Sequence, residues 1–165
     1  MFKSFRNLFT LTILLGLSLV SFAQKDTSAI KTLSRGADII LTGKVDKTES
    51  GWNSSRTRIY TKVTLEVDEY LKGAKNAPSL EITYPGGEVG DVGELYSHMP
   101  RFTEKEEVLV FLKKSKRGTA YKVLHGESGK ITLVNDERTG EKVTSSNVRL
   151  HSLKAAIKSY LSNEK

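Results

Sequence analysis

The chain has 165 residues, with 26 Lys or Arg, 19 Asp or Glu, three His and no Cys. A formal net charge of +7 is too small and too dispersed to indicate a nucleic-acid-binding protein. The lack of cysteine excludes disulfides, thiolate metal ligands and lipid attachment at a cysteine.

The first 23 residues have the pattern of a secretory signal peptide. Lys3 and Arg6 precede an apolar segment, residues 8–20, and Ser21-Phe22-Ala23 places small residues where signal peptidase reads. We expect cleavage after Ala23, which leaves residues 24–165 as one exported domain, periplasmic or secreted, with no membrane span. A retained anchor is the weaker alternative, because the apolar segment is short for a span of about 20 residues.

After a short helix predicted over residues 26–34, the chain has the alternating pattern of β-strands. The clearest example is RIYTKVTLEVDEYLKG, residues 58–73. Every second residue of this segment lies on the same face of the strand, and that face is mainly apolar. Further strands are predicted in residues 37–49, 79–84, 107–114, 119–124, 130–134 and 142–144. Turn sequences separate them, and NDERTG is typical of a tight hairpin.

The C-terminal segment has the period of an amphipathic helix over residues 147–162, with Ser146 or Asn147 as the expected N-cap. Short strands between two helices predict a mainly β, α+β domain. We expect an OB-like antiparallel barrel, closed or partly open, with its core in about residues 37–144 and the C-terminal helix packed on it.

The segment TYPGGEVGDVG, residues 83–93, raises the question of a phosphate-binding loop. Its glycines at 86, 87, 90 and 93 do not have the i, i+2, i+5 spacing of a dinucleotide fingerprint, and no helical period follows. We therefore interpret it as a structured loop that needs glycine for positive φ and close chain approach.

Other motifs also fall short of a known chemistry. HGESGKIT, residues 125–132, lacks residues that a P-loop and a nucleophile elbow require, so Ser128 is interpreted as a turn residue. His98, His125 and His151 are scattered without metal-ligand spacing. We therefore predict no metal, no cofactor and no catalytic residue.

Several segments together resemble an uncharacterised bacterial exported domain that occurs alone or near matrixin-type metallopeptidase regions. They are ADIILTGKV, TRIYTKVTLEVDEYLKG, PGGEVGDVG, PRFTEKEEVLVFLKK and YKVLHGESGKITL, and they span residues 37–134. The order of elements is also similar to the OB barrel of netrin and tissue-inhibitor-of-metalloproteinase domains. That resemblance implies the barrel, but not the inhibitory residues, since those domains use an N-terminal cysteine where this chain has Gln24.

The leading hypothesis is a non-catalytic exported domain that binds a protein or an envelope polymer through its barrel loops, with protease-inhibitor-like binding as one form of it. The candidate binding residues lie in the first hairpin, the glycine-rich loop with its continuation, and a basic hairpin tip: Trp52, Gly86, Gly87, Glu88, Arg101, Phe102, Lys113, Lys114, Lys116 and Arg117. One alternative is an enzyme of metal-dependent hydrolase type, assembled from His98, His125, Glu88 and Asp91. Another is a structural component of an envelope assembly.

Overall fold

The structure is a computed structural model that describes residues 28–73, 77–115 and 120–163. Two units are distinguished, residues 1–32 and residues 33–165. In the first unit, residues 28–32 are described and are helical; the second unit carries everything discussed below. The predicted signal peptide and Asp26 lie outside the described residues.

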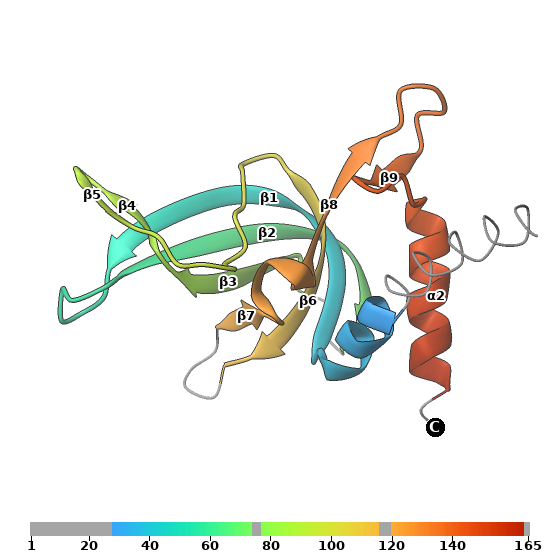
Figure 1. Ribbon diagram of the computed structural model, residues 1–165, viewed down its shortest axis with the longest axis horizontal. Coiled ribbons are helices and arrows are strands. Elements are labelled where there is room, and N and C mark those ends of the chain that lie inside the picture. Colours follow the sequence, from blue (N-terminus) through green and yellow to red (C-terminus); the bar gives the residue numbers. More distant parts are fainter. Residues whose placement is uncertain (1–27, 74–76, 116–119, 164–165) are drawn as a thin grey trace, which may run out of the picture. The chain divides into compact units, whose positions relative to one another are not determined.

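Five strands form a closed barrel in the order β1-β2-β3-β7-β6, because β1 pairs with β2 along one edge and with β6 along the other (Figure 1). All pairings are antiparallel except β3 with β7, which run parallel where Ile82 lies opposite Tyr121. This is an OB-like barrel, and the predicted α+β fold class is confirmed. The strands are β1 (Ile39–Trp52), β2 (Ile59–Lys72), β3 (Ser79–Pro85), β6 (Glu107–Lys114) and β7 (Tyr121–Val123).

The remaining elements extend this barrel at its sides. A 3-10 helix, η1 (Gly126–Gly129), leads into β8 (Lys130–Asn135), which pairs with β6, and β9 (Lys142–Thr144) pairs with β8. A separate hairpin of β4 (Gly87–Val89) and β5 (Val92–Glu94) lies in Figure 1 at the opposite end of the barrel from helix α2 (Leu150–Ser162).

The core follows from the alternation seen in the sequence. In β2, Ile59, Val63 and Leu65 are fully buried while Tyr60 and Lys62 between them are exposed. In β1 the alternation is interrupted by a register shift between Val45 and Lys47. The barrel interior is filled by the following side chains: Ile39, Leu41, Val45, Val63, Leu65, Leu80, Ile82, Phe102, Val108, Val110, Leu112 and Tyr121.

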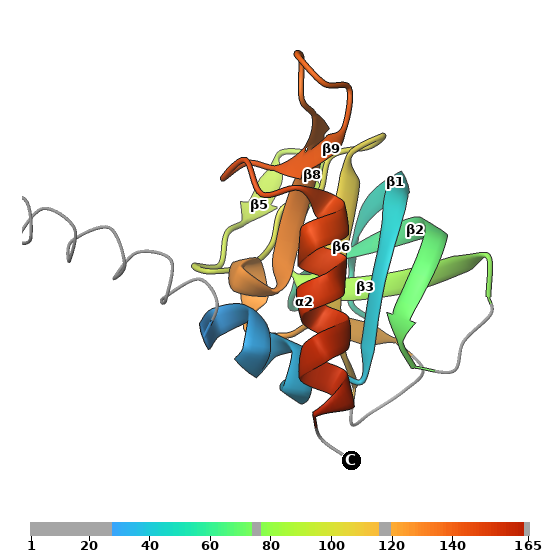
Figure 2. The same cartoon turned by 90° about the vertical axis from the view of Figure 1, so that its right-hand side faces the viewer.

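Helix α2 runs along the outside of the sheet (Figure 2). Leu153 and Ile157 are its buried residues. Two lysines of the helix bind the same carboxylate of β2, with Lys154 Nζ 2.6 Å and Lys158 Nζ 3.3 Å from Glu69. Apolar packing and this double ion pair therefore hold the helix on the barrel.

Several predicted boundaries were wrong. The C-terminal helix begins at Leu150 and not at residue 147, since Asn147 has a φ of 60° and Arg149 occupies the N-cap position without a side-chain hydrogen bond. The first helix continues through Gly36. Strand β1 extends to Trp52, into a segment expected to be a turn, and the predicted long loop contains the β4–β5 hairpin. Within the described ranges, no helix is long and apolar enough to cross a membrane.

Candidate binding pocket

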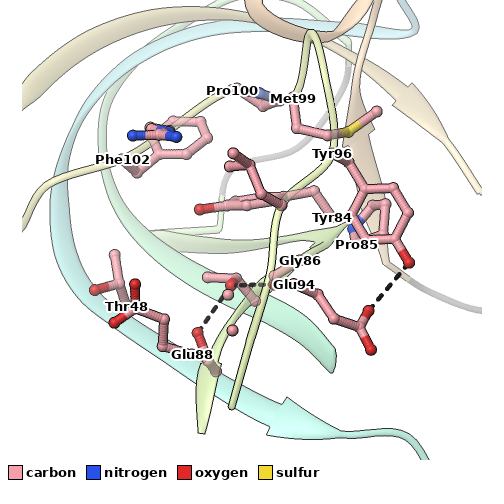
Figure 3. Close-up of a pocket in the computed structure, with 16 residues that line it drawn as sticks. Thr48, Tyr84, Pro85, Gly86, Glu88, Glu94, Tyr96, Met99, Pro100 and Phe102 are labelled. Atoms are coloured by element: carbon pink, nitrogen blue, oxygen red, sulfur yellow. Dashed lines mark hydrogen bonds between the residues drawn. The ribbon is translucent and has the colours of Figure 1, made fainter. Parts of the chain in front are cut away.

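A pocket of about 570 Å³ lies where β1, β2 and β3 extend past the buried core (Figure 3). The β4–β5 hairpin and the segment that follows it form the rest of its wall. The lining combines hydroxyl groups, aromatic rings and charges of both signs: Thr48, Ser50, Thr61, Tyr84, Pro85, Gly86, Gly87, Glu88, Gly93, Glu94, Leu95, Tyr96, Met99, Pro100, Arg101 and Phe102.

The strands supply a row of hydroxyl groups. Ser50, Thr61 and Tyr84 lie opposite one another in the register of β1, β2 and β3, so their side chains share one face. The Thr61 hydroxyl donates to the carbonyl of Gly86 at 2.7 Å, which leaves Ser50 as the donor in its 2.9 Å hydrogen bond with Thr61. This series of hydrogen bonds ends on the Gly86 carbonyl oxygen, which does not act as a general base. The series therefore does not activate Ser50 as a nucleophile.

Two glycines allow the β4–β5 hairpin to lie directly on these hydroxyls. Gly86 and Gly87 have φ of 102° and 129°, and a Cβ on Gly87 would come within 2.3 Å of Ser50 Oγ and 2.4 Å of Thr61 Oγ1. Gly90 also has positive φ, at the hairpin turn, where no neighbouring atom is close. The prediction that the glycines serve backbone geometry is confirmed at these three positions, and a strand rather than a helix follows them.

The aromatic wall joins the pocket to the core. Phe102 is buried, its ring centroid lies 6.0 Å from that of Tyr84, and the Lys130 Nζ lies 5.0 Å from the Phe102 centroid. Burial raises the pKa of the Tyr84 hydroxyl, against a smaller opposing effect of its hydrogen bonding with Thr61 and with the Phe102 backbone. The Tyr84 side chain is therefore held in the wall of the pocket by contacts of both its ring and its hydroxyl.

A nearly buried ion pair fixes the loop behind Phe102. Lys130 Nζ lies 2.6 Å from Glu106 Oε1, and the two side chains are 12% and 14% exposed. Burial opposes ionisation of Glu106, but hydrogen bonds from Lys130, Thr132 and the Thr103 N–H outweigh it and lower the pKa of this carboxyl. Lys130 also donates to the Arg101 carbonyl, so one ammonium group holds both ends of the segment 101–106.

The rim of the pocket is polar on one side and apolar on the other. The Tyr96 hydroxyl donates to Glu94 Oε2 at 3.0 Å (Figure 3), and Arg58 lies 3.5 Å from the same hydroxyl. No carboxylate pairs with the Arg101 guanidinium among the residues that the structure describes. Leu95 is 79% exposed although it borders the pocket. The rim thus presents groups that are free to contact another molecule.

The structure brings together half of the predicted binding residues. Gly86, Gly87, Glu88, Arg101 and Phe102 all line this pocket.

The other predicted residues do not line it. Trp52 is 39% exposed at the end of β1. Lys113 and Lys114 lie at the end of β6, where the Lys113 Nζ pairs with Asp38 at 2.7 Å and the Lys114 N–H donates to the same carboxylate. Lys116 and Arg117 lie outside the described residues.

Of the residues considered for an enzyme, Glu88 lines the pocket, whereas Asp91, His98 and His125 do not. His98 Nδ1 lies 3.3 Å from Glu127, and both side chains are mostly exposed. His125 precedes η1, Ser128 lies within η1, and neither lines the pocket. In residues 28–73, 77–115 and 120–163, no group of three or more His, Asp or Glu side chains is placed to hold a metal ion.

Sequence reasoning missed the strand-borne part of the pocket, namely Thr48, Ser50, Thr61 and Tyr84. Thr61 and Tyr84 were assigned to strands, and their facing positions were visible in the alternation. Ser50 lies just beyond the predicted strand 37–49, and the register shift that turns it and Thr48 inward has no sequence signal of its own.

No protein-family model and no curated protein matches the chain.

Proposed function

We propose that the chain is an exported, non-catalytic binding domain that recognises a protein or an envelope polymer at the end of the barrel where the pocket lies. The observation that carries this proposal is the pocket itself, which combines hydroxyl groups, three aromatic rings and the Arg101 guanidinium, with which no carboxylate of the described residues pairs. Such a mixture fixes the orientation of a bound group through a few polar contacts and gains affinity from apolar burial.

The arrangement of the side chains favours binding over catalysis. The Ser50 hydroxyl donates to Thr61, the Thr61 hydroxyl donates to the Gly86 carbonyl, and the carboxylate of Glu106 behind Phe102 is paired with Lys130. General acid–base chemistry requires a group that can exchange a proton with the reactant, and these groups are already committed.

The resemblance to tissue-inhibitor domains adds exported metallopeptidases as one class of protein partner. The proposal takes only the barrel from that resemblance, because the inhibitory cysteine of those domains has no counterpart in a chain without cysteine.

The test is capture of partners from exported fractions by the purified chain and by matched variants. The double variant Leu95→Ser, Arg101→Ala changes exposed groups of the rim, and Val134→Ser removes a 48% exposed apolar group of β8 outside the pocket. We expect proteins or polymers that the wild type and Val134→Ser retain and that the double variant loses. Equal capture by all three chains would refute a role for the pocket.

A further inference from the structure

The outer half of β1 has one edge with no neighbouring strand. β1 pairs with β6 only from Ile39 to Lys44, whereas its pairing with β2 continues to Trp52. Beyond Lys44, the segment before β6 covers the edge briefly: the Val45 N–H donates to the Glu106 carbonyl and the Lys105 N–H to the Val45 carbonyl. The Glu104 side chain then accepts from the Thr48 N–H at 3.4 Å.

The register shows which backbone groups point to this edge. The Asn53 N–H donates to the Arg58 carbonyl, and hydrogen-bonded pairs alternate along an antiparallel ladder. Trp52, Ser50 and Thr48 are therefore at non-hydrogen-bonded positions with respect to β2, and their N–H and C=O groups point away from it. The contact from the Thr48 N–H to Glu104 agrees with this assignment.

Five backbone groups are left open along this edge. They have no partner among the described residues and follow one another along the strand: the Thr48 carbonyl, the N–H and carbonyl of Ser50, and the N–H and carbonyl of Trp52. An edge of this kind is a template for another strand. Its side chains Thr48 and Ser50 also line the pocket, so the edge and the pocket are continuous.

We propose that the partner binds by adding an extended peptide segment as a strand along Thr48–Trp52, with alternate side chains entering the pocket. This inference rests on the proposed function and restricts the partner to a protein. The reason is chemical: a series of alternating N–H and C=O groups matches an extended peptide backbone, whereas a polysaccharide has no repeating backbone amide. The exposed side chains of Trp52, at the end of the edge, and of Leu95, in the pocket lining, offer apolar contacts for the alternate residues.

The experiment uses random twelve-residue peptides displayed on phage, selected against the purified chain. A selected peptide is then synthesised with an N-methyl group at each position in turn. Since every second residue of the added strand turns its N–H toward β1, methylation must weaken binding about tenfold or more at alternate positions and little at the others. This scan leaves the protein unchanged and is independent of whether any variant folds.

Two variants of the chain test the same geometry from the other side. Ser50→Pro removes the N–H that points to the open edge while the β1–β2 ladder keeps its bonds, and Ser50→Ala keeps that N–H and removes only the hydroxyl. We expect Ser50→Pro to lose at least about tenfold more peptide affinity than Ser50→Ala, with both chains folded by their thermal unfolding.

Other outcomes separate this inference from the proposed function. A peptide that binds without the alternating pattern, or equally to Ser50→Pro, overturns strand addition and leaves a binding pocket. Binding of chitohexaose or a peptidoglycan fragment at the pocket, with no peptide selected, assigns the site to a polymer and also overturns it. Concentration-dependent dimers of the chain that Ser50→Pro abolishes would mean that the edge is occupied by a second copy. If neither peptides nor these glycans bind, both proposals fail.

Discussion

Replacing Lys130 by methionine tests whether the wall of the pocket depends on a buried charge. In the wild type this ammonium group contacts Glu106, the Arg101 carbonyl and the face of Phe102. Methionine has a similar length and keeps the apolar contact, but it leaves the Glu106 carboxylate, 14% exposed, without its counter-charge. Removing one partner of a buried pair costs about 3–5 kcal/mol. Because Thr132 and the Thr103 N–H still donate to Glu106, we expect about 2–4 kcal/mol.

The assay is urea unfolding of four chains at neutral pH: the wild type, Lys130→Met, Glu106→Gln and the double variant. We expect the double variant to recover at least about half of the loss in Lys130→Met, because it removes the uncompensated charge. A loss below about 1 kcal/mol in Lys130→Met would show that the pair behaves like an exposed one, and it would refute the argument from burial.

The dependence on pH gives the same reasoning a second check. The folded-state pKa of Glu106 in the wild type is lowered, so its contribution to stability is full above the unfolded value of about 4.3 and is lost as pH falls through the folded value. In Lys130→Met, burial without the ammonium group should raise this pKa. The difference in unfolding free energy between the two chains must therefore shrink between about pH 7 and about pH 4. A constant difference would contradict the role of the Lys130 charge in keeping Glu106 ionised.

Three further predictions concern other parts of the domain. Gly87→Ala should destabilise the domain by about 2–4 kcal/mol in urea unfolding, since its Cβ meets two hydroxyls and its φ is 129°. Gly90→Ala, in open space at a φ of 60°, should cost about 1 kcal/mol. Equal losses in the two variants would contradict the close contact of the hairpin. Thr42→Val should raise the unfolding free energy by about 1 kcal/mol, because this 2% exposed hydroxyl has no hydrogen-bond partner in the described chain, and a loss of stability would mean that it has one. The hydrogen bond from Lys154 lowers the pKa of Glu69, so the protection of the α2 amides, measured as exchange relative to the unfolded chain at the same pH, should decrease in the wild type as pH falls below about 4. This protection should depend less on pH in Glu69→Gln.

The strands were predictable where one face of the strand is buried and the other is exposed to solvent. In β2 this condition holds over most of the strand, and the alternation from Ile59 to Leu65 in the sequence is the alternation of burial in the fold. The fold class followed, because short alternating segments separated by turns have few ways to bury one face each. Closure of the barrel through β1 and β6 depends on residues far apart in the chain and has no local pattern.

The pocket was predictable only on its loop side. The glycine-rich composition indicated Gly86 and Gly87 as candidates, and the position in a long loop indicated Arg101 and Phe102. The strand side depends on the register shift after Val45, which moves the inward positions of β1 from odd to even numbers. The anchoring pair joins Glu106, in the loop just before β6, to Lys130, the first residue of β8, and nothing in either local sequence indicates the other.

The shift in β1 also explains how one strand serves both stability and recognition. Before the shift, Leu41 and Val45 point into the core and the strand is paired on both edges. After it, Thr48 and Ser50 face the pocket and one edge is open. An apolar row there would have closed the pocket and left a hydrophobic open edge, which is prone to aggregation. Polar residues keep this end of the barrel soluble and still leave its backbone groups available, so substitutions in the outer half of β1 should alter binding with little effect on the barrel.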